Sequence, residues 1–168
     1  SSNVVIPRAL LVSALLVAVG ASGAHAVVIP IVINLPTRGI GYSSIDDRLY
    51  VSVPNSSATN PNTLLPINPH TGALGSAIPA GFDPNAIVTS NDGTKLHVVF
   101  GGNRGVQPFD ITTHSLGTPF TVAGGPTVRH IHSIPGRPNA VLMTLAMGSD
   151  AAGTYIWENG TQLPQHVG

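Results

Sequence analysis

Residues 91–99 read NDGTKLHVV, a turn signal followed directly by a strand-like run. The Asn-Asp-Gly start favours a tight turn, because Asn and Asp side chains bond the nearby backbone and glycine accepts positive φ. A phrase of the same order, DDRLYVSV, occupies residues 46–53. The two phrases place Leu96 47 residues after Leu49. We therefore interpret them as one structural unit that occurs twice.

The rest of the chain after residue 36 extends this unit into a repeat. Ile67 precedes Phe109 by 42 residues, and Phe109 precedes Ile156 by 47. Short runs of apolar residues alternate with turn signals throughout, and each unit holds four such runs. The expected strands cover residues 38–44, 48–53, 63–68 and 73–80 in the first unit, 86–90, 95–100, 105–111 and 116–123 in the second, and 128–134, 140–147, 154–159 and 161–167 in the third.

Four strands per unit with a period in the forties are typical of β-propeller blades. We therefore expect an all-β protein with about three four-stranded antiparallel blades, over residues 37–85, 86–127 and 128–168. Apolar side chains on successive residues suit inner strands that are covered on both faces. The last strand of each unit carries a proline, which an edge strand tolerates because it need not donate every ladder bond.

Several phrases resemble the YVTN-type, NHL-like β-propeller repeats of secreted bacterial proteins. In those repeats DGxxLYV opens one strand and xxxFDxxTG closes the next. Here RLYVSV at residues 48–53, the sequence DGTKLHV at residues 92–98 and VQPFDITTHS at residues 106–115 occupy these places, with Thr-His instead of the second Thr-Gly. The similarity extends over residues 37–165. It implies the propeller fold and leaves the function open, since propellers host lyases, lactonases, dehydrogenases and binding proteins.

Three blades are fewer than the four to eight that usually close a propeller ring. A partial ring would leave open sheet edges. We therefore expect this chain to be the N-terminal portion of a longer protein. A trimer of three-bladed chains is the alternative.

The N-terminal segment has the pattern of a secretory signal peptide. Arg8 precedes an apolar run at residues 9–19, and the small-residue sequence Ala-His-Ala ends at Ala26. This order predicts a signal helix within residues 1–26 that is cleaved after Ala26, with the propeller region over residues 27–168. An uncleaved anchor is the alternative, because no charged residue occurs at residues 9–37. We expect a secreted, periplasmic or cell-surface protein, in contact with a membrane only if this segment is uncleaved.

The charge and cysteine content exclude several classes of function. Charged residues make up 8% of the chain, the formal net charge is zero, and the basic residues are scattered. Nucleic acid is therefore not an expected partner, because no basic stripe is present to neutralise phosphates. Cysteine is absent, which excludes disulfides, thiolate metal sites and a cysteine nucleophile. The expected partner is an unknown protein or small-molecule ligand.

The closest histidine pair in the sequence is His130 and His132. On a strand, residues two apart point to one face, so both imidazoles are candidate ligands of a divalent metal. A third ligand would have to come from elsewhere, with His97, Asp92 or Asp110 as candidates. No other cofactor is expected. The alternative is a polar strand face without bound metal.

The remaining polar residues suggest binding more than catalysis. Arg104 and Arg129 are candidate binding residues for an acidic ligand. The aspartates lie in turns, where their carboxylates bond the backbone, and Glu158 is the only glutamate, so an acid/base pair has no support. The sequence therefore favours an exported, non-enzymatic propeller that acts as a binding scaffold. The alternative is a lactonase- or lyase-like propeller enzyme that uses channel-facing histidines and aspartates.

Overall fold

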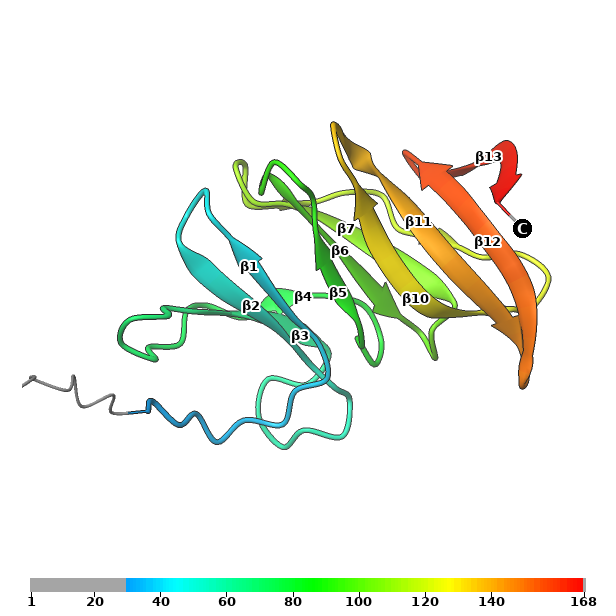
Figure 1. Cartoon of the computed structure of the whole chain (residues 1–168). Helices are drawn as coiled ribbons and strands as arrows, with labels where there is room; N and C mark the ends of the chain where they lie inside the picture. The colour runs from blue at the N-terminus through cyan, green and yellow to red at the C-terminus, as the bar shows by residue number, and fades with distance from the viewer. Residues whose placement is uncertain (1–29, 168) are drawn as a thin grey trace, which may run out of the picture. The chain divides into compact units, whose positions relative to one another are not determined.

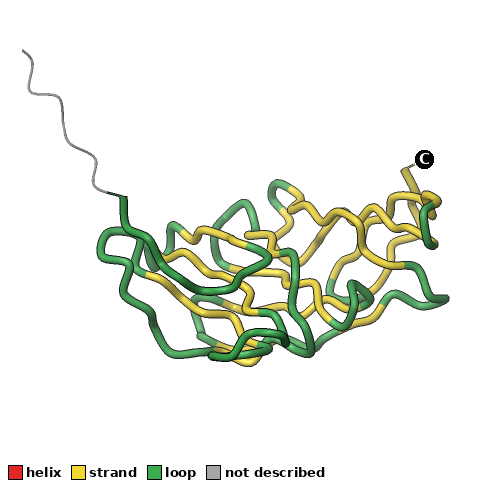
Figure 2. The backbone as a smooth tube through the Cα atoms, turned by 90° about the horizontal axis from the view of Figure 1, so that it is seen from below, coloured by secondary structure: helices red, strands yellow, loops and turns green. Residues whose placement is uncertain are grey.

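The computed structural model describes residues 30–167, with side chains described as far as Pro164. Every regular element in this part is a β-strand, which confirms the all-β prediction (Figure 2). The predicted signal helix lies outside the described residues. Among residues 30–167, no helix is long and apolar enough to cross a bilayer.

The strands form three antiparallel sheets that follow one another along the chain (Figure 1). The first sheet contains β1 (Ile40–Ser43), β2 (Arg48–Val53), β3 (Thr63–Ile67) and β4 (Ile78–Pro79). The second contains β5 (Ile87–Thr89), β6 (Lys95–Phe100), β7 (Gly105–Asp110), β8 (Ser115–Leu116) and β9 (Phe120–Thr121). The third contains β10 (Thr127–Ile134), β11 (Arg137–Met147), β12 (Asp150–Glu158) and β13 (Thr161–Val167).

The fourth strand of the second sheet is divided in two. Both β8 and β9 pair with β7, and Gly117, Thr118 and Pro119 separate them. The first sheet has the same break, since Leu74 bridges to Ile67 before β4 begins. Each sheet is thus four strands deep. Pro79 lies in the outer strand β4 and Pro119 in the break between β8 and β9, but Pro66 and Pro108 lie in the inner strands β3 and β7.

The strand register shows that the sequence repeat is also a structural repeat. Tyr50 in β2 pairs with Pro66 in β3, and His97 in β6 pairs with Pro108 in β7. A spacing of 47 residues relates Tyr50 to His97, and a spacing of 42 residues relates Pro66 to Pro108. His97 occupies the structural position of Tyr50.

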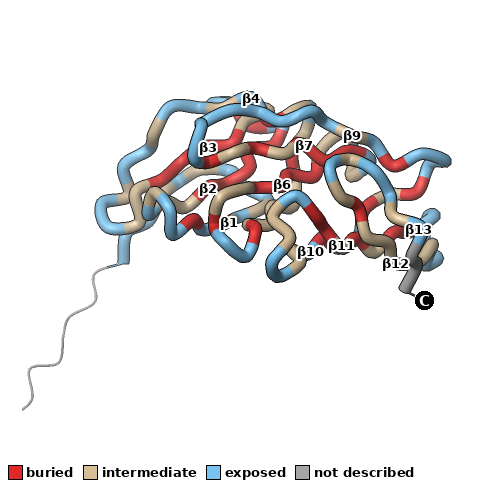
Figure 3. The backbone as a smooth tube through the Cα atoms, turned by 90° about the horizontal axis from the view of Figure 1, so that it is seen from above, coloured by how far each residue is buried: buried red, intermediate tan, exposed pale blue. Residues whose placement is uncertain are grey.

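Apolar side chains pack face to face between consecutive sheets, and the buried segments lie along the middle strands (Figure 3). The cluster between the first and second sheets contains Tyr50, Leu64, Ala80, Leu96, Val98, Phe109 and Ile111. The cluster between the second and third contains Val99, Val106, Val122, Val128, Ile131, Val141, Met143, Leu145 and Trp157. Burial of each large apolar side chain contributes about 1.5–3 kcal/mol, so these clusters are the main forces that hold the sheets together.

The outer face of the first sheet has a different cover. Val51 and Val53 in β2, with Leu65 and Ile67 in β3, form a buried cluster against which Ile33 and Leu35 pack. Residues 31–35 therefore take the place that a neighbouring sheet occupies at the other two interfaces.

The first and second sheets also approach closely through their backbones. The Gly39 N–H donates to Ser52 Oγ at 2.8 Å, and that hydroxyl donates to the Asn85 carbonyl oxygen. A Cβ atom at position 39 would collide with the same carbonyl oxygen, so glycine is required there. At the other end of β1, Ser43 Oγ donates to the Gly93 carbonyl oxygen at 3.1 Å. The Asn-Asp-Gly turn is thus tied to the sheet before it.

Candidate functional site

One end of the second and third sheets carries two exposed arginines on neighbouring backbone segments. Arg104 ends the turn between β6 and β7, and Arg129 lies near the start of β10. The Val128 N–H donates to the Asn103 carbonyl oxygen at 2.6 Å. Arg104 directly follows Asn103, and Arg129 directly follows Val128. The structure therefore brings together the two arginines that the sequence suggested for binding.

These two arginines differ from the other described basic residues in their lack of a carboxylate partner. Among residues 30–167, neither Arg104 nor Arg129 forms an ion pair, and Arg129 Nη2 donates to the Ser149 carbonyl oxygen at 3.2 Å. The other described lysine and arginines are paired: Arg38 with Asp83 at 2.7 Å, Arg48 with Asp46 at 3.8 Å, Lys95 with Asp110 at 2.7 Å and Arg137 with Glu158 at 2.7 Å.

An unpaired guanidinium at the surface is suited to bind an anion. Its planar fork of N–H donors matches a carboxylate or phosphate, and it stays charged at every physiological pH. Two such groups on adjacent segments, with Arg129 partly held by the Ser149 carbonyl, offer a carboxylate more than one donor set. Arg104 and Arg129 are therefore candidate anion-binding residues.

His130 and His132 lie beside this site on one face of β10. They pair with Thr144 and Leu142 of β11, and both are exposed. Within the described part of the chain, no three His, Asp or Glu side chains come together as metal ligands. The histidine pair therefore supplies at most two ligands from the described residues.

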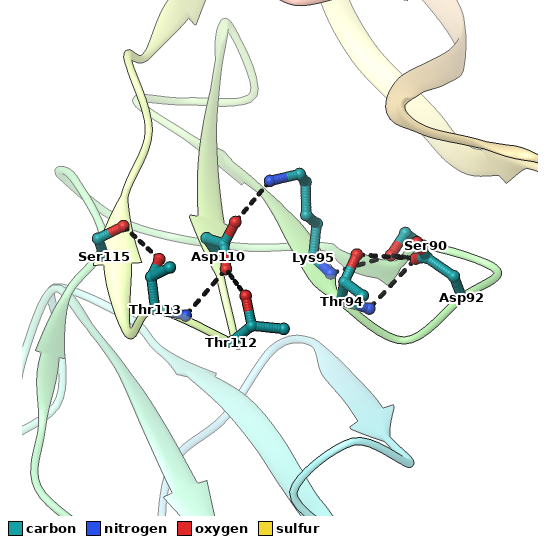
Figure 4. Close-up of polar contacts among 8 residues, drawn as sticks. All are labelled: Ser90, Asp92, Thr94, Lys95, Asp110, Thr112, Thr113 and Ser115. Atoms are coloured by element: carbon teal, nitrogen blue, oxygen red, sulfur yellow. Dashed lines mark hydrogen bonds and ion pairs between the residues drawn. The ribbon is translucent and has the colours of Figure 1, made fainter.

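The three suggested third ligands have other surroundings. Asp92 accepts hydrogen bonds from Ser90 Oγ at 2.6 Å and Thr94 Oγ1 at 2.9 Å within the turn between β5 and β6. Figure 4 shows this turn beside the second network, which is built on Asp110. His97 is buried between the second and third sheets. None of the three is placed with the histidine pair in a described cluster.

Asp110 has a structural role that the sequence repeat already indicated. Its carboxylate accepts hydrogen bonds from Lys95 Nζ at 2.7 Å, Thr112 Oγ1 at 2.6 Å and the Thr113 N–H at 3.0 Å (Figure 4). The Lys95 hydrogen bond, followed by those from the two threonines, holds the pKa of Asp110 well below its usual range. This network fixes the turn between β7 and β8.

His97 is the residue whose surroundings the sequence did not reveal. His97 is only 3% exposed, and its Nδ1 has no hydrogen-bond partner among the described residues. Burial, with a smaller contribution from the nearby Lys95 charge, lowers the pKa of His97 to about 4. The equivalent residue Tyr50 does have a partner, because its hydroxyl donates to Asp46 Oδ2 at 2.6 Å. This difference between the two positions is visible only in the three-dimensional structure.

No family model matches this chain. No curated protein matches it either. Solved structures, in contrast, do align with this chain. Hydrazine synthase of Kuenenia stuttgartiensis aligns with a TM-score of 0.61 and 15% identity, over 79% of this chain and 36% of that chain.

A β-propeller domain and a set of WD40 repeats align comparably. The β-propeller domain of Cps50 (Swd1) from Myceliophteria thermophila gives a TM-score of 0.59 at 15% identity, over 78% of this chain and 40% of that one. The RRP9 WD40 repeats give 0.60 at 12% identity, over 82% and 40%. This chain thus spans less than half the length of these structures. At such identities the likeness concerns the fold alone, and it supports a propeller-like fold for this chain.

Proposed function

We propose that this protein is an exported, propeller-type binding scaffold that recognises an acidic partner through Arg104 and Arg129. The observation that carries the proposal is that these are the described basic side chains without a carboxylate partner, on segments joined by the Val128–Asn103 hydrogen bond. A partner carboxylate would supply the missing counter-charge.

The fold supports the scaffold part of this proposal. WD40 repeats and a propeller domain are among the structures with the same arrangement of sheets. Turns at the ends of a rigid stack of sheets present side chains in fixed positions, as a binding surface requires. The lactonase- or lyase-like alternative has no support from a cluster of metal ligands among the described residues.

A binding experiment with a defined acidic probe tests the role of the arginines. Fluorescence anisotropy would measure the affinity of a labelled hexaglutamate peptide for the full chain and for the Arg104→Glu/Arg129→Glu variant. We expect the double charge reversal to weaken binding by about tenfold or more at low salt, because two favourable contacts become repulsive. Binding by the native chain should also weaken as salt is added.

A charge reversal at a distant arginine separates a local site from a general electrostatic effect. Arg48 lies in β2 near the opposite end of the sheets and is only loosely paired with Asp46 at 3.8 Å. The Arg48→Glu variant should retain the affinity for hexaglutamate after allowance for net charge. Failure of hexaglutamate to bind the native chain, or equal weakening by Arg48→Glu, would contradict the proposal.

The export part rests on the signal-peptide pattern at residues 1–26. Cleavage after Ala26 would make Val27 the first residue of the exported protein. Intact-mass measurement of the protein recovered outside the cytoplasm would show whether the exported chain begins at Val27. A recovered product that keeps the first 26 residues would favour the uncleaved anchor instead.

A further inference from the structure

A cavity of about 330 Å³ lies between the second and third sheets, away from Arg104 and Arg129. Its walls include His97, Lys95, Asp110 and Phe120 from the second sheet. Asn139 and Asn159 of the third sheet complete it. A volume of this size is within the range of small-molecule binding sites.

The walls carry no net charge. Lys95 and Asp110 neutralise one another at 2.7 Å, and burial keeps the His97 imidazole neutral. A charged ligand would lose its hydration in this cavity without meeting an unpaired counter-charge, which is unfavourable. The cavity therefore favours an uncharged ligand.

The polar groups of the walls offer both donors and acceptors. The side-chain amides of Asn139 and Asn159 each present an N–H₂ group and a carbonyl oxygen. The backbone N–H of Asn159 donates to the Asn139 carbonyl oxygen at 3.1 Å, which holds the two residues side by side. His97 adds to the wall an imidazole whose Nδ1 is itself enclosed by the protein and has no described hydrogen-bond partner. Hydroxyl groups match such a wall, because each one can donate and accept.

One wall is aromatic and rigid. The Phe120 ring stacks on Trp157, with centroids 5.4 Å apart and an interplanar angle of 15°. Trp157 is only 7% exposed, so the pair is fixed by the packing between the sheets. The face of an aromatic ring carries partial negative charge, which attracts the polarised C–H groups of a sugar ring.

The equivalent cavity between the first and second sheets shows that this arrangement is not simply a by-product of the repeat. There Tyr50 takes the place of His97, and its hydroxyl is satisfied by Asp46 at 2.6 Å. The residue 47 positions after Asp46 is Gly93, so the second unit has no carboxylate at the position equivalent to Asp46. In the first cavity the Tyr50 hydroxyl is paired and Asp46 Oδ1 is a buried atom without a described partner, whereas in the second cavity that atom is the imidazole nitrogen His97 Nδ1.

We propose that the cavity at His97 binds a neutral, polyhydroxylated ligand of monosaccharide size. The amides and the imidazole bond its hydroxyl groups, and its apolar face lies on Phe120. This site is independent of the acidic-partner site at Arg104 and Arg129, and either one can exist without the other.

Sugar binding to the full chain tests this proposal. Saturation-transfer NMR and calorimetry would be run with glucose, galactose and N-acetylglucosamine, and with the charged analogues glucosamine and glucuronate. We expect at least one neutral sugar to bind and the charged analogues to bind more weakly. No binding by any of the three neutral sugars, or preference for a charged analogue, overturns the proposal.

Three variants locate the site. His97→Phe removes the imidazole, Asn139→Ala removes an exposed amide, and Asn159→Gly removes the other amide while suiting its φ of 50°. Each is expected to weaken sugar binding by about tenfold, the usual effect of one lost hydrogen bond. The conservative exposed change Asn139→Ala keeps the test valid if His97→Phe impairs folding.

Two control variants complete the design. Tyr50→Phe alters the equivalent cavity and should leave sugar binding unchanged. Arg104→Glu/Arg129→Glu should also leave it unchanged, so a failure of the acidic-partner site would not be confused with a failure here. Sugar binding that survives the combined Asn139→Ala/Asn159→Gly substitution contradicts the proposed site.

Discussion

His97 shows how one residue changes the chemistry of a repeated position. Tyr50 and His97 both pair with a proline on the next strand and both face the following sheet. The tyrosine hydroxyl reaches Asp46, but the shorter imidazole has no described partner at Nδ1. The 47-residue spacing of the sequence repeat aligns His97 with Tyr50. It could not indicate the unsatisfied nitrogen, because that depends on which side chains the third sheet brings nearby.

Burial of His97 predicts a specific dependence of stability on pH. The folded imidazole gains its proton only near pH 4, whereas the unfolded one gains it near pH 6.5. Protonation therefore favours the unfolded chain as the pH falls through this interval, and stability decreases by up to about 3 kcal/mol. The urea midpoint of the native chain should thus decline between pH 6.5 and pH 4, and His97→Phe should remove this part of the decline.

The carboxylates act in a different pH interval. Asp110 has a lowered pKa, so its contribution is present above its unfolded value of 3.8 and is lost only at lower pH. His132→Gln, a change at an exposed histidine, is the matched control and should keep the decline between pH 6.5 and pH 4. An equal decline in His97→Phe and the native chain would show that His97 is not buried in this way.

At the scale of elements, turn chemistry and spacing predicted most strands. The expected strands at residues 63–68 and 95–100 correspond to β3 and β6, and the Asn-Asp-Gly turn lies between β5 and β6. The third unit was less well predicted, because β11 begins at Arg137 and not at residue 140. Gly136 has a φ of 74° and closes a shorter turn than expected. A register shift near Ile134 then accommodates Pro138 within the strand.

The interfaces between elements predict where substitutions are costly. Phe109 in β7 is 1% exposed within the cluster between the first and second sheets, whereas Phe82 is 62% exposed. Phe109→Ala should reduce the free energy of unfolding by about 3–5 kcal/mol. Phe82→Ala, the same chemical change at the surface, should alter it by no more than about 0.5 kcal/mol.

Urea denaturation with an unchanged m value measures both effects. Similar losses of stability in the two variants would mean that Phe109 does not lie in the packed interface.

At the scale of the whole molecule, the repeat and the resemblance predicted a propeller arrangement, and the solved structures support it. The candidate arginines were also suggested by the sequence. Their shared location could not be predicted, because it depends on a hydrogen bond between Asn103 and Val128, which are far apart in the chain. The cavity at His97 was not predicted for the same reason. Both features arise only where consecutive sheets meet.

Consecutive four-stranded sheets pack face to face in this protein, in the manner of propeller blades. Double-mutant cycles across both interfaces test this packing most directly. One cycle uses Tyr50→Leu and Phe109→Leu, whose rings lie 6.0 Å apart, and the other uses Phe120→Leu and Trp157→Leu, at 5.4 Å. We expect a coupling free energy of about 0.5–1.5 kcal/mol within each pair.

Tyr50 and Trp157 serve as the control pair, because they lie at different interfaces and their effects should simply add. Urea unfolding of the single and double variants supplies the free energies for all three pairs. Coupling at both interfaces and additivity in the control pair is the predicted result. Additivity in all three pairs, with each coupling below about 0.3 kcal/mol, would contradict the packing of the sheets as blades.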